Sequence, residues 1–156
     1  MFESRERLGR QIDDLLETIR LLSRGRYACL SEPGRVLFES SDPEWRESAA
    51  LRRLIEEQGA AVFAIPGSMA IGGAMQDVFH AWAEHEFLLA VINGRVALVV
   101  ACPEAERLRQ PVLPLLKALA DRLLRYDARY RLDRRGRGFF VGQPKLDLVV
   151  IGRSEG

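Results

Sequence analysis

Long apolar runs, an excess of one charge and a leader-like N-terminus are all missing from this 156-residue sequence. No uninterrupted apolar stretch approaches the ~18 residues that a membrane-spanning helix needs. The first ten residues, MFESRERLGR, lack the apolar core of a signal peptide. The 23 basic and 22 acidic residues leave a net charge of +1, too small to recruit nucleic acid or acidic lipid through a global field. We therefore expect a cytoplasmic protein with no membrane or nucleic-acid partner.

Cysteine and histidine, which supply many metal ligands and nucleophiles, are scarce as well. Cys29 and Cys102 are the only cysteines, and both lie in apolar, strand-like surroundings that suit reduced core thiols. His80 and His85, the only histidines, are five residues apart, which puts them on opposite faces of a strand or about 140° apart on a helix. No serine-centred elbow or phosphate-binding glycine loop is present. The sequence therefore predicts no catalytic residue, no cofactor, no metal and no enzymatic activity.

The clearest structural signal is a β-hairpin. Two apolar runs, residues 87–92 and 96–102, flank Asn93 and Gly94. An Asn-Gly pair accepts the positive φ angles of a type I′ turn, whose twist matches that of paired strands. Neither run alternates between polar and apolar residues, so we expect both faces of this hairpin to be covered.

Amphipathic helices and further strands surround the hairpin. Apolar residues recur at helical spacing in residues 5–24 and again from Leu113 to Leu124, where prolines 111 and 114 mark the beginning. A helix before Gly59 is predicted to begin at Asp42 and Pro43, with Asp42 as its N-cap. Strands are expected at residues 27–30, 36–39 and 146–151. The pattern of residues 76–85 suits either a helix or a strand, and we favour a strand because it completes a three-stranded meander with the hairpin.

This order of elements resembles the Roadblock (dynein light chain) family of the profilin-like, longin and GAF-type folds. The resemblance covers residues 8–126 and is carried by QIDDLLETIRLL, EPGRVLFES and FLLAVINGRVALVVACPEA with LLKALADRLL. It implies one α+β domain over residues 1–156, a three-layer α/β/α-type sandwich around a mainly antiparallel sheet of about five strands. The core would span about residues 5–128, and residues 129–156 would add a C-terminal strand near 146–151. With the family's strand order, Cys29 and Cys102 would lie on neighbouring strands.

The resemblance also implies partners. Roadblock proteins form homodimers that pair sheets edge to edge and helices against helices, and prokaryotic members bind Ras-like small GTPases or signalling scaffolds. We therefore expect a non-enzymatic, homodimeric interaction or regulatory domain. The apolar stripe of the first helix must be buried against the sheet or against a second subunit, and the interface candidates on it are Leu8, Ile12, Leu15 and Ile19.

The GAF-type fold shares nearly the same core and gives the alternative function, a sensory domain that binds a small molecule between the sheet and residues 68–85. The side chains that would line such a pocket are Met69, Met75, Phe79, Trp82 and Phe87. The same residues also suit ordinary core packing.

Arginines gather near the C-terminus, at positions 122, 125, 129, 131, 134, 135 and 137. Asp121, Asp127 and Asp133 are interspersed among them. Such alternating charge is typical of a solvated helix face and turn rather than of a nucleic-acid-binding patch.

Overall fold

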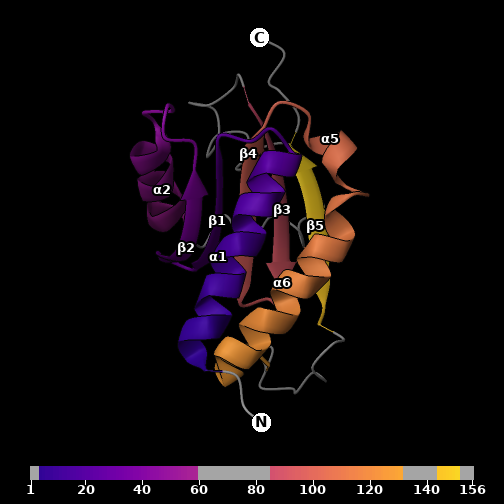
Figure 1. Cartoon of the computed structure of the whole chain (residues 1–156). Coiled ribbons are helices and arrows are strands. Elements are labelled where there is room, and N and C mark those ends of the chain that lie inside the picture. Colours follow the sequence, from indigo (N-terminus) through magenta and orange to yellow (C-terminus); the bar gives the residue numbers. More distant parts are fainter. Residues whose placement is uncertain (1–3, 60–84, 132–143, 152–156) are drawn as a thin grey trace.

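A five-stranded antiparallel sheet organises the structure (Figure 1). The computed structural model describes residues 4–59, 85–131 and 144–151. The strands are β1 (Tyr27–Glu32), β2 (Arg35–Ser41), β3 (Glu86–Ile92), β4 (Val96–Cys102) and β5 (Leu146–Ile151). The helices are α1 (Arg5–Leu22), α2 (Ser48–Glu57), α5 (Ala105–Leu108) and α6 (Val112–Tyr126), followed by a short 3-10 helix, η3 (Ala128–Arg131). The strand order is β2-β1-β4-β3-β5, which leaves β2 and β5 at the two edges.

Helices α1 and α6 lie side by side across one face of the sheet (Figure 1). The Ser4 hydroxyl caps α1 by accepting the Arg7 N–H at 3.2 Å. Helix α6 begins directly after Pro111 and carries Pro114 in its first turn, where a backbone N–H has no partner within the helix. The predictions for both helices are confirmed. None of the described helices combines the length and the apolarity that crossing a membrane requires.

Helix α2 covers part of the opposite face. Its Leu51 and Ile55 belong to a buried cluster that includes Tyr27 and Cys29 of β1. Helices therefore lie on both faces of the sheet, as the predicted three-layer α+β sandwich requires. The predicted beginning of this helix was wrong: α2 begins at Ser48, because Asp42 accepts the Glu44 N–H at 3.0 Å in a turn and pairs with Arg26 at 2.7 Å.

The hairpin of β3 and β4 forms as predicted. Asn93 and Gly94 have φ angles of 53° and 67°, and the Arg95 N–H donates to the Ile92 carbonyl at 2.9 Å. Both strands are buried on both faces, apart from Glu86 at the start of β3. This burial on two faces agrees with the near-continuous apolar runs of the sequence.

The predicted C-terminal strand is confirmed as β5, and it pairs antiparallel with β3 from Phe87↔Ile151 to Ile92↔Leu146. The other predicted neighbour of this hairpin, residues 76–85, lies outside the described residues except for His85, which is a bend directly before β3. The edge of β3 on which that segment would complete a meander is occupied by β5.

Asn93 fixes this arrangement. Its backbone N–H donates to the Lys145 carbonyl, and its side-chain oxygen accepts the Lys145 N–H, both at 2.8 Å. Its side-chain amide donates to the Tyr130 carbonyl at 2.8 Å, and the residue is 1% exposed. One buried side chain thus joins the hairpin, η3 and the beginning of β5.

Replacing Asn93 by Gly is expected to cost about 1–3 kcal/mol of unfolding free energy. Glycine keeps the positive φ angle but leaves the buried Tyr130 carbonyl and the part-buried Lys145 N–H without their side-chain partner. Gly94→Asn in the same turn is the control. Nothing lies within 4 Å of a Cβ at Gly94, and asparagine tolerates its φ of +67°, so we expect a cost below about 1 kcal/mol. Urea unfolding measures both variants, and equal midpoints would refute the role given to Asn93.

Candidate functional site at the edges of the sheet

Among the described residues, the two edge strands of the sheet differ in what protects their outer backbone groups. An unpaired edge can accept a strand from another chain, and proteins that avoid this shield the edge with charges, bulges or a neighbouring element. Strands β2 and β5 therefore mark the two places where this sheet could grow.

Strand β2 carries a β-bulge. The register with β1 shifts from Leu30↔Phe38 to Ser31↔Val36, which leaves Leu37 as the extra residue. Leu37 and Phe38 consequently both pack on the α1–α6 side of the sheet. A bulge bends and twists an edge strand and breaks the regular series of outward donors and acceptors.

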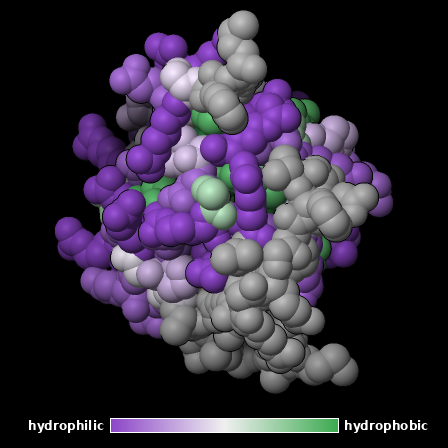
Figure 2. Space-filling view, turned by 90° about the horizontal axis from the view of Figure 1, so that it is seen from below, coloured by the Kyte–Doolittle hydropathy of each residue, from purple (hydrophilic) through white to green (hydrophobic). Residues whose placement is uncertain are grey.

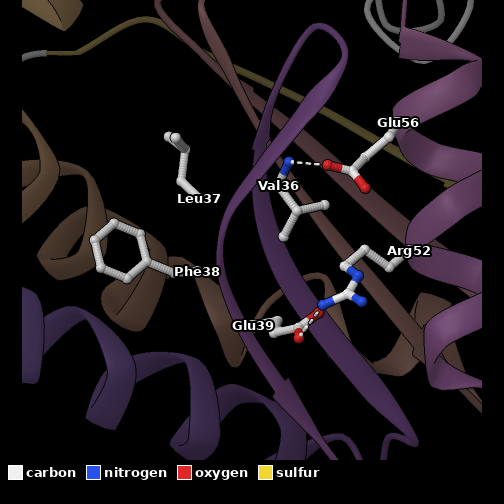
Figure 3. A pocket seen from close by; sticks show the side chains of 6 residues that line it. All are labelled: Val36, Leu37, Phe38, Glu39, Arg52 and Glu56. Carbon is white, nitrogen blue, oxygen red and sulfur yellow. Dashed lines mark hydrogen bonds and ion pairs between the residues drawn. The ribbon is translucent and has the colours of Figure 1, made fainter.

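Charged side chains of α2 close the same edge (Figure 3). The Glu56 carboxylate accepts the Val36 N–H at 3.1 Å, and Arg52 pairs with Glu39 at 2.9 Å. Between β2 and α2 lies an open groove of about 340 Å³, lined by Val36, Leu37, Phe38, Glu39, Arg52 and Glu56. Its charged groups are thus already engaged within the chain.

The Glu39 carboxylate also accepts a hydrogen bond from the Tyr27 hydroxyl, at 2.6 Å. Burial, with the nearby Glu39 charge adding to it, raises the pKa of Tyr27 far above that of an exposed tyrosine. Tyr27 therefore stays a neutral donor, and Glu39 is held between it and Arg52.

Strand β5, in contrast, is regular and mostly apolar. Its pairing with β3 shows no register shift over six residues, and among the described strands it pairs with β3 alone. Every residue of β5 is half-buried, so its side chains touch the core and still reach the surface. Its one charged residue, Asp147, pairs at 3.8 Å with Lys145, which directly precedes the strand.

The outward backbone groups of β5 follow from its register. The Asn93 N–H donates to the Lys145 carbonyl, so the backbone of residue 145 faces β3. In an antiparallel pair this direction alternates along the strand, so residues 147, 149 and 151 also turn their backbone toward β3. The N–H and C=O groups of Leu146, Leu148 and Val150 therefore point to the outer edge.

The interface candidates from the sequence lie elsewhere. Leu8, Ile12 and Ile19 are at most 3% exposed and belong to the core between α1, α6 and the sheet. Leu15 is half-buried against the same cluster. Leu8, Ile12 and Ile19 are thus buried against their own sheet, and a second subunit could reach these three residues only by unpacking α1, whereas Leu15 stays partly accessible.

Other apolar side chains at the end of α1 are exposed. Leu21 and Leu22 are 61% and 49% exposed, the two large apolar residues so exposed in the described part of the chain. A hollow of about 420 Å³ is lined by residues that follow α1 and β4, namely Ser23, Arg24, Pro103, Glu104, Arg107 and Leu108. Helical spacing places Leu21, nine residues after Ile12, opposite the apolar stripe of α1, whereas it places Leu22 on that stripe. The sequence pattern therefore agrees with the exposure of Leu21 but not with that of Leu22.

Most of the predicted ligand-pocket residues cannot be placed, because Met69, Met75, Phe79 and Trp82 lie outside the described residues. Phe87 is 1% exposed and packs in the cluster that includes Leu51 and Ile55 of α2. His80 also lies outside the described residues, and the His85 ring lies 5.4 Å from that of Trp45. Over residues 4–59, 85–131 and 144–151, no three His, Cys, Asp or Glu residues gather as metal ligands.

The two cysteines lie on neighbouring strands, β1 and β4, but on opposite faces of the sheet. Cys29 belongs to the cluster under α2 and Cys102 to the cluster under α1 and α6. Both are fully buried, and burial raises the pKa of each thiol to about 12. They are core residues with unreactive thiols.

The described arginines of the C-terminal cluster make local contacts. Arg122 and Arg125 pair with Asp121, each at 3.3 Å, and Arg129 pairs with Asp127 at 2.6 Å. Arg131 donates to the Leu124 carbonyl at 3.1 Å. Figure 2 looks onto the end of the molecule where α1 begins and α6 ends, and hydrophilic residues dominate the described surface there. This is the solvated, charge-paired surface that the alternating sequence predicts.

Comparison of the chain with protein-family models, with curated proteins and with solved structures gives no match. The resemblance to Roadblock proteins therefore stays a prediction, and a functional proposal depends on the geometry of the sheet edges.

Replacing Glu56 by Ala is expected to uncap the β2 edge. The Val36 N–H loses its acceptor, so its amide hydrogen should exchange at least about tenfold faster, with about 1 kcal/mol or less lost in unfolding free energy because the site is near solvent. Glu57→Ala, which changes an exposed neighbour on the same helix, is the matched control. Equal Val36 exchange in the two variants would show that Glu56 does not cap this edge.

Proposed function

We propose that this protein is a non-enzymatic, homodimeric interaction domain of a regulatory kind, and that β5 is the edge through which it dimerises. The observation that carries the proposal is the difference between the two edges. Strand β2 is bulged and capped by α2, whereas β5 is unbulged, apolar and half-exposed. A regular apolar edge of this kind favours strand addition.

A second copy of the same strand fits this edge. Two-fold symmetric interfaces place the same surface patch of each subunit against the other, so one regular edge strand is sufficient to build both sides. Antiparallel addition of β5 to β5 would give a continuous sheet of ten strands, five from each copy. It would also bury the half-exposed apolar side chains of β5.

The downstream partner is proposed from the resemblance alone. If the homodimer acts as prokaryotic Roadblock proteins do, it binds a Ras-like small GTPase or a signalling scaffold and works by reshaping that partner. The exposed Leu21 and Leu22 are apolar side chains that such a partner could contact. The alternative, a small-molecule sensor of the GAF type, has no supporting observation among the described residues.

A proline at position 150 tests the proposed edge. The Val150 N–H points away from β3, so proline removes a donor to the second copy without breaking the β3 ladder. We expect Val150→Pro to weaken dimerisation roughly tenfold to a hundredfold, because one bond is lost on each side of the two-fold axis. Light scattering across a concentration series measures the effect.

Val150→Ala is the control, because it also removes the branched side chain of valine but keeps the N–H. Circular dichroism and thermal unfolding verify that both variants fold. A Val150→Pro variant that dimerises as tightly as Val150→Ala would contradict dimerisation through β5.

A further inference from the structure

We infer that the second copy pairs antiparallel to β5 with the two-fold axis at Leu148, so that Leu148 lies opposite its own counterpart. This inference rests on the proposed homodimer and adds its register. The register decides which side chains meet and on which faces the helices of the two copies lie.

The outward backbone groups select this register. Leu146, Leu148 and Val150 offer three N–H and three C=O groups at the edge. With the axis at Leu148, Leu148 exchanges two hydrogen bonds with the partner's Leu148, and Leu146 faces the partner's Val150 on each side of the axis. All six donors and acceptors of one copy then meet those of the other in hydrogen-bonded pairs.

Neighbouring registers fit less well. An axis at Asp147 would place the two Asp147 carboxylates directly opposite each other, and like charges in that position are destabilising. An axis at Val149 would pair Leu148 with the partner's Val150 and leave Leu146 without a counterpart inside β5. With the axis at Leu148, Asp147 faces the partner's Val149, and no like charges are opposed.

This symmetry also arranges the helices. A two-fold axis between opposed antiparallel residues runs perpendicular to the sheet, so each face of one copy continues into the same face of the other. The α1 and α6 helices of both copies would then share one side of the ten-stranded sheet. The two Leu21–Leu22 pairs would lie on that helix layer, as two equivalent contact points for a bivalent partner.

Single cysteine variants at neighbouring positions of β5 test the register. In the proposed register the Cα atoms of Leu148 and the partner's Leu148 are about 5.5 Å apart, within the range that a disulfide bridges. Residue 149 and its counterpart are diagonal neighbours, roughly 7–8 Å apart, beyond that range. We expect oxidation of Leu148→Cys to cross-link most of the dimer and Val149→Cys to give at least about fivefold less.

The native thiols do not interfere, because Cys29 and Cys102 are fully buried. The mass of each variant is also measured under reducing conditions. This mass shows whether the dimer forms, and the cross-linking pattern then tests its register. If Leu148→Cys does not fold, the double variant Asp147→Cys, Val149→Cys serves instead, since these two positions face each other across the axis.

The outcomes separate the two proposals. Efficient cross-linking at 148 and little at 149 supports the register. Cross-linking at 149 instead overturns the register but keeps the β5 dimer. A reduced dimer that cross-links at neither position, nor in the double variant, overturns pairing through β5 altogether. A chain that stays monomeric under reducing conditions overturns the proposed homodimer itself.

Discussion

The pairing of β5 with the outer edge of β3 is the constraint on which the rest of the structure depends. It places a strand from the end of the chain beside the central hairpin and fixes the order β2-β1-β4-β3-β5. Asn93 anchors it, since this buried side chain holds both the beginning of β5 and the carbonyl of Tyr130. Tyr130 in turn donates from its hydroxyl to Glu32 at the end of β1. A turn residue of the hairpin thereby positions the strand that forms one edge.

That position explains why the two edges differ. Strand β2 lies next to α2, whose Arg52 and Glu56 reach its backbone and side chains, and a bulge at Leu37 interrupts its regular pairing. Strand β5 lies at the far edge and has only Asp147 and the nearby Lys145 as charges. The N–H and C=O groups of every second residue of β5 form hydrogen bonds with β3. Those of the residues between them therefore point outward in a regular series. The proposed function follows from this series.

Local patterns in the sequence predicted the elements well. The Asn-Gly pair specified the hairpin, helical spacing specified α1 and α6, and the apolar run near the C-terminus specified β5, because each of these signals is contained within a short stretch. The helix start predicted at Asp42 and Pro43 was wrong, because an aspartate side chain can accept a backbone N–H in a turn as well as at the beginning of a helix. Here the pairing of Asp42 with Arg26 and its bond to Glu44 hold a turn, and α2 begins six residues after Asp42.

Relations between distant residues were the part that the sequence did not reveal. Cys29 and Cys102 do lie on neighbouring strands, but their opposite faces depend on the register of β1 with β4. From the sequence, Leu8, Ile12 and Ile19 could be buried against either the sheet or a second subunit. The structure buries them in the core between α1, α6 and the sheet. The bulge and the Glu56 cap of β2 leave no sequence signal, so the contrast between the edges could not be foreseen.

Amide hydrogen exchange of β5 across a protein concentration series tests the central claim most directly. The Val149 N–H faces β3 and should exchange slowly at every concentration, whereas the Leu148 N–H faces the outer edge and should be protected only where the dimer forms. The account predicts that Leu148 exchange slows with rising concentration while Val149 exchange stays constant. A Leu148 exchange rate that is unchanged from low to high micromolar concentration would contradict it.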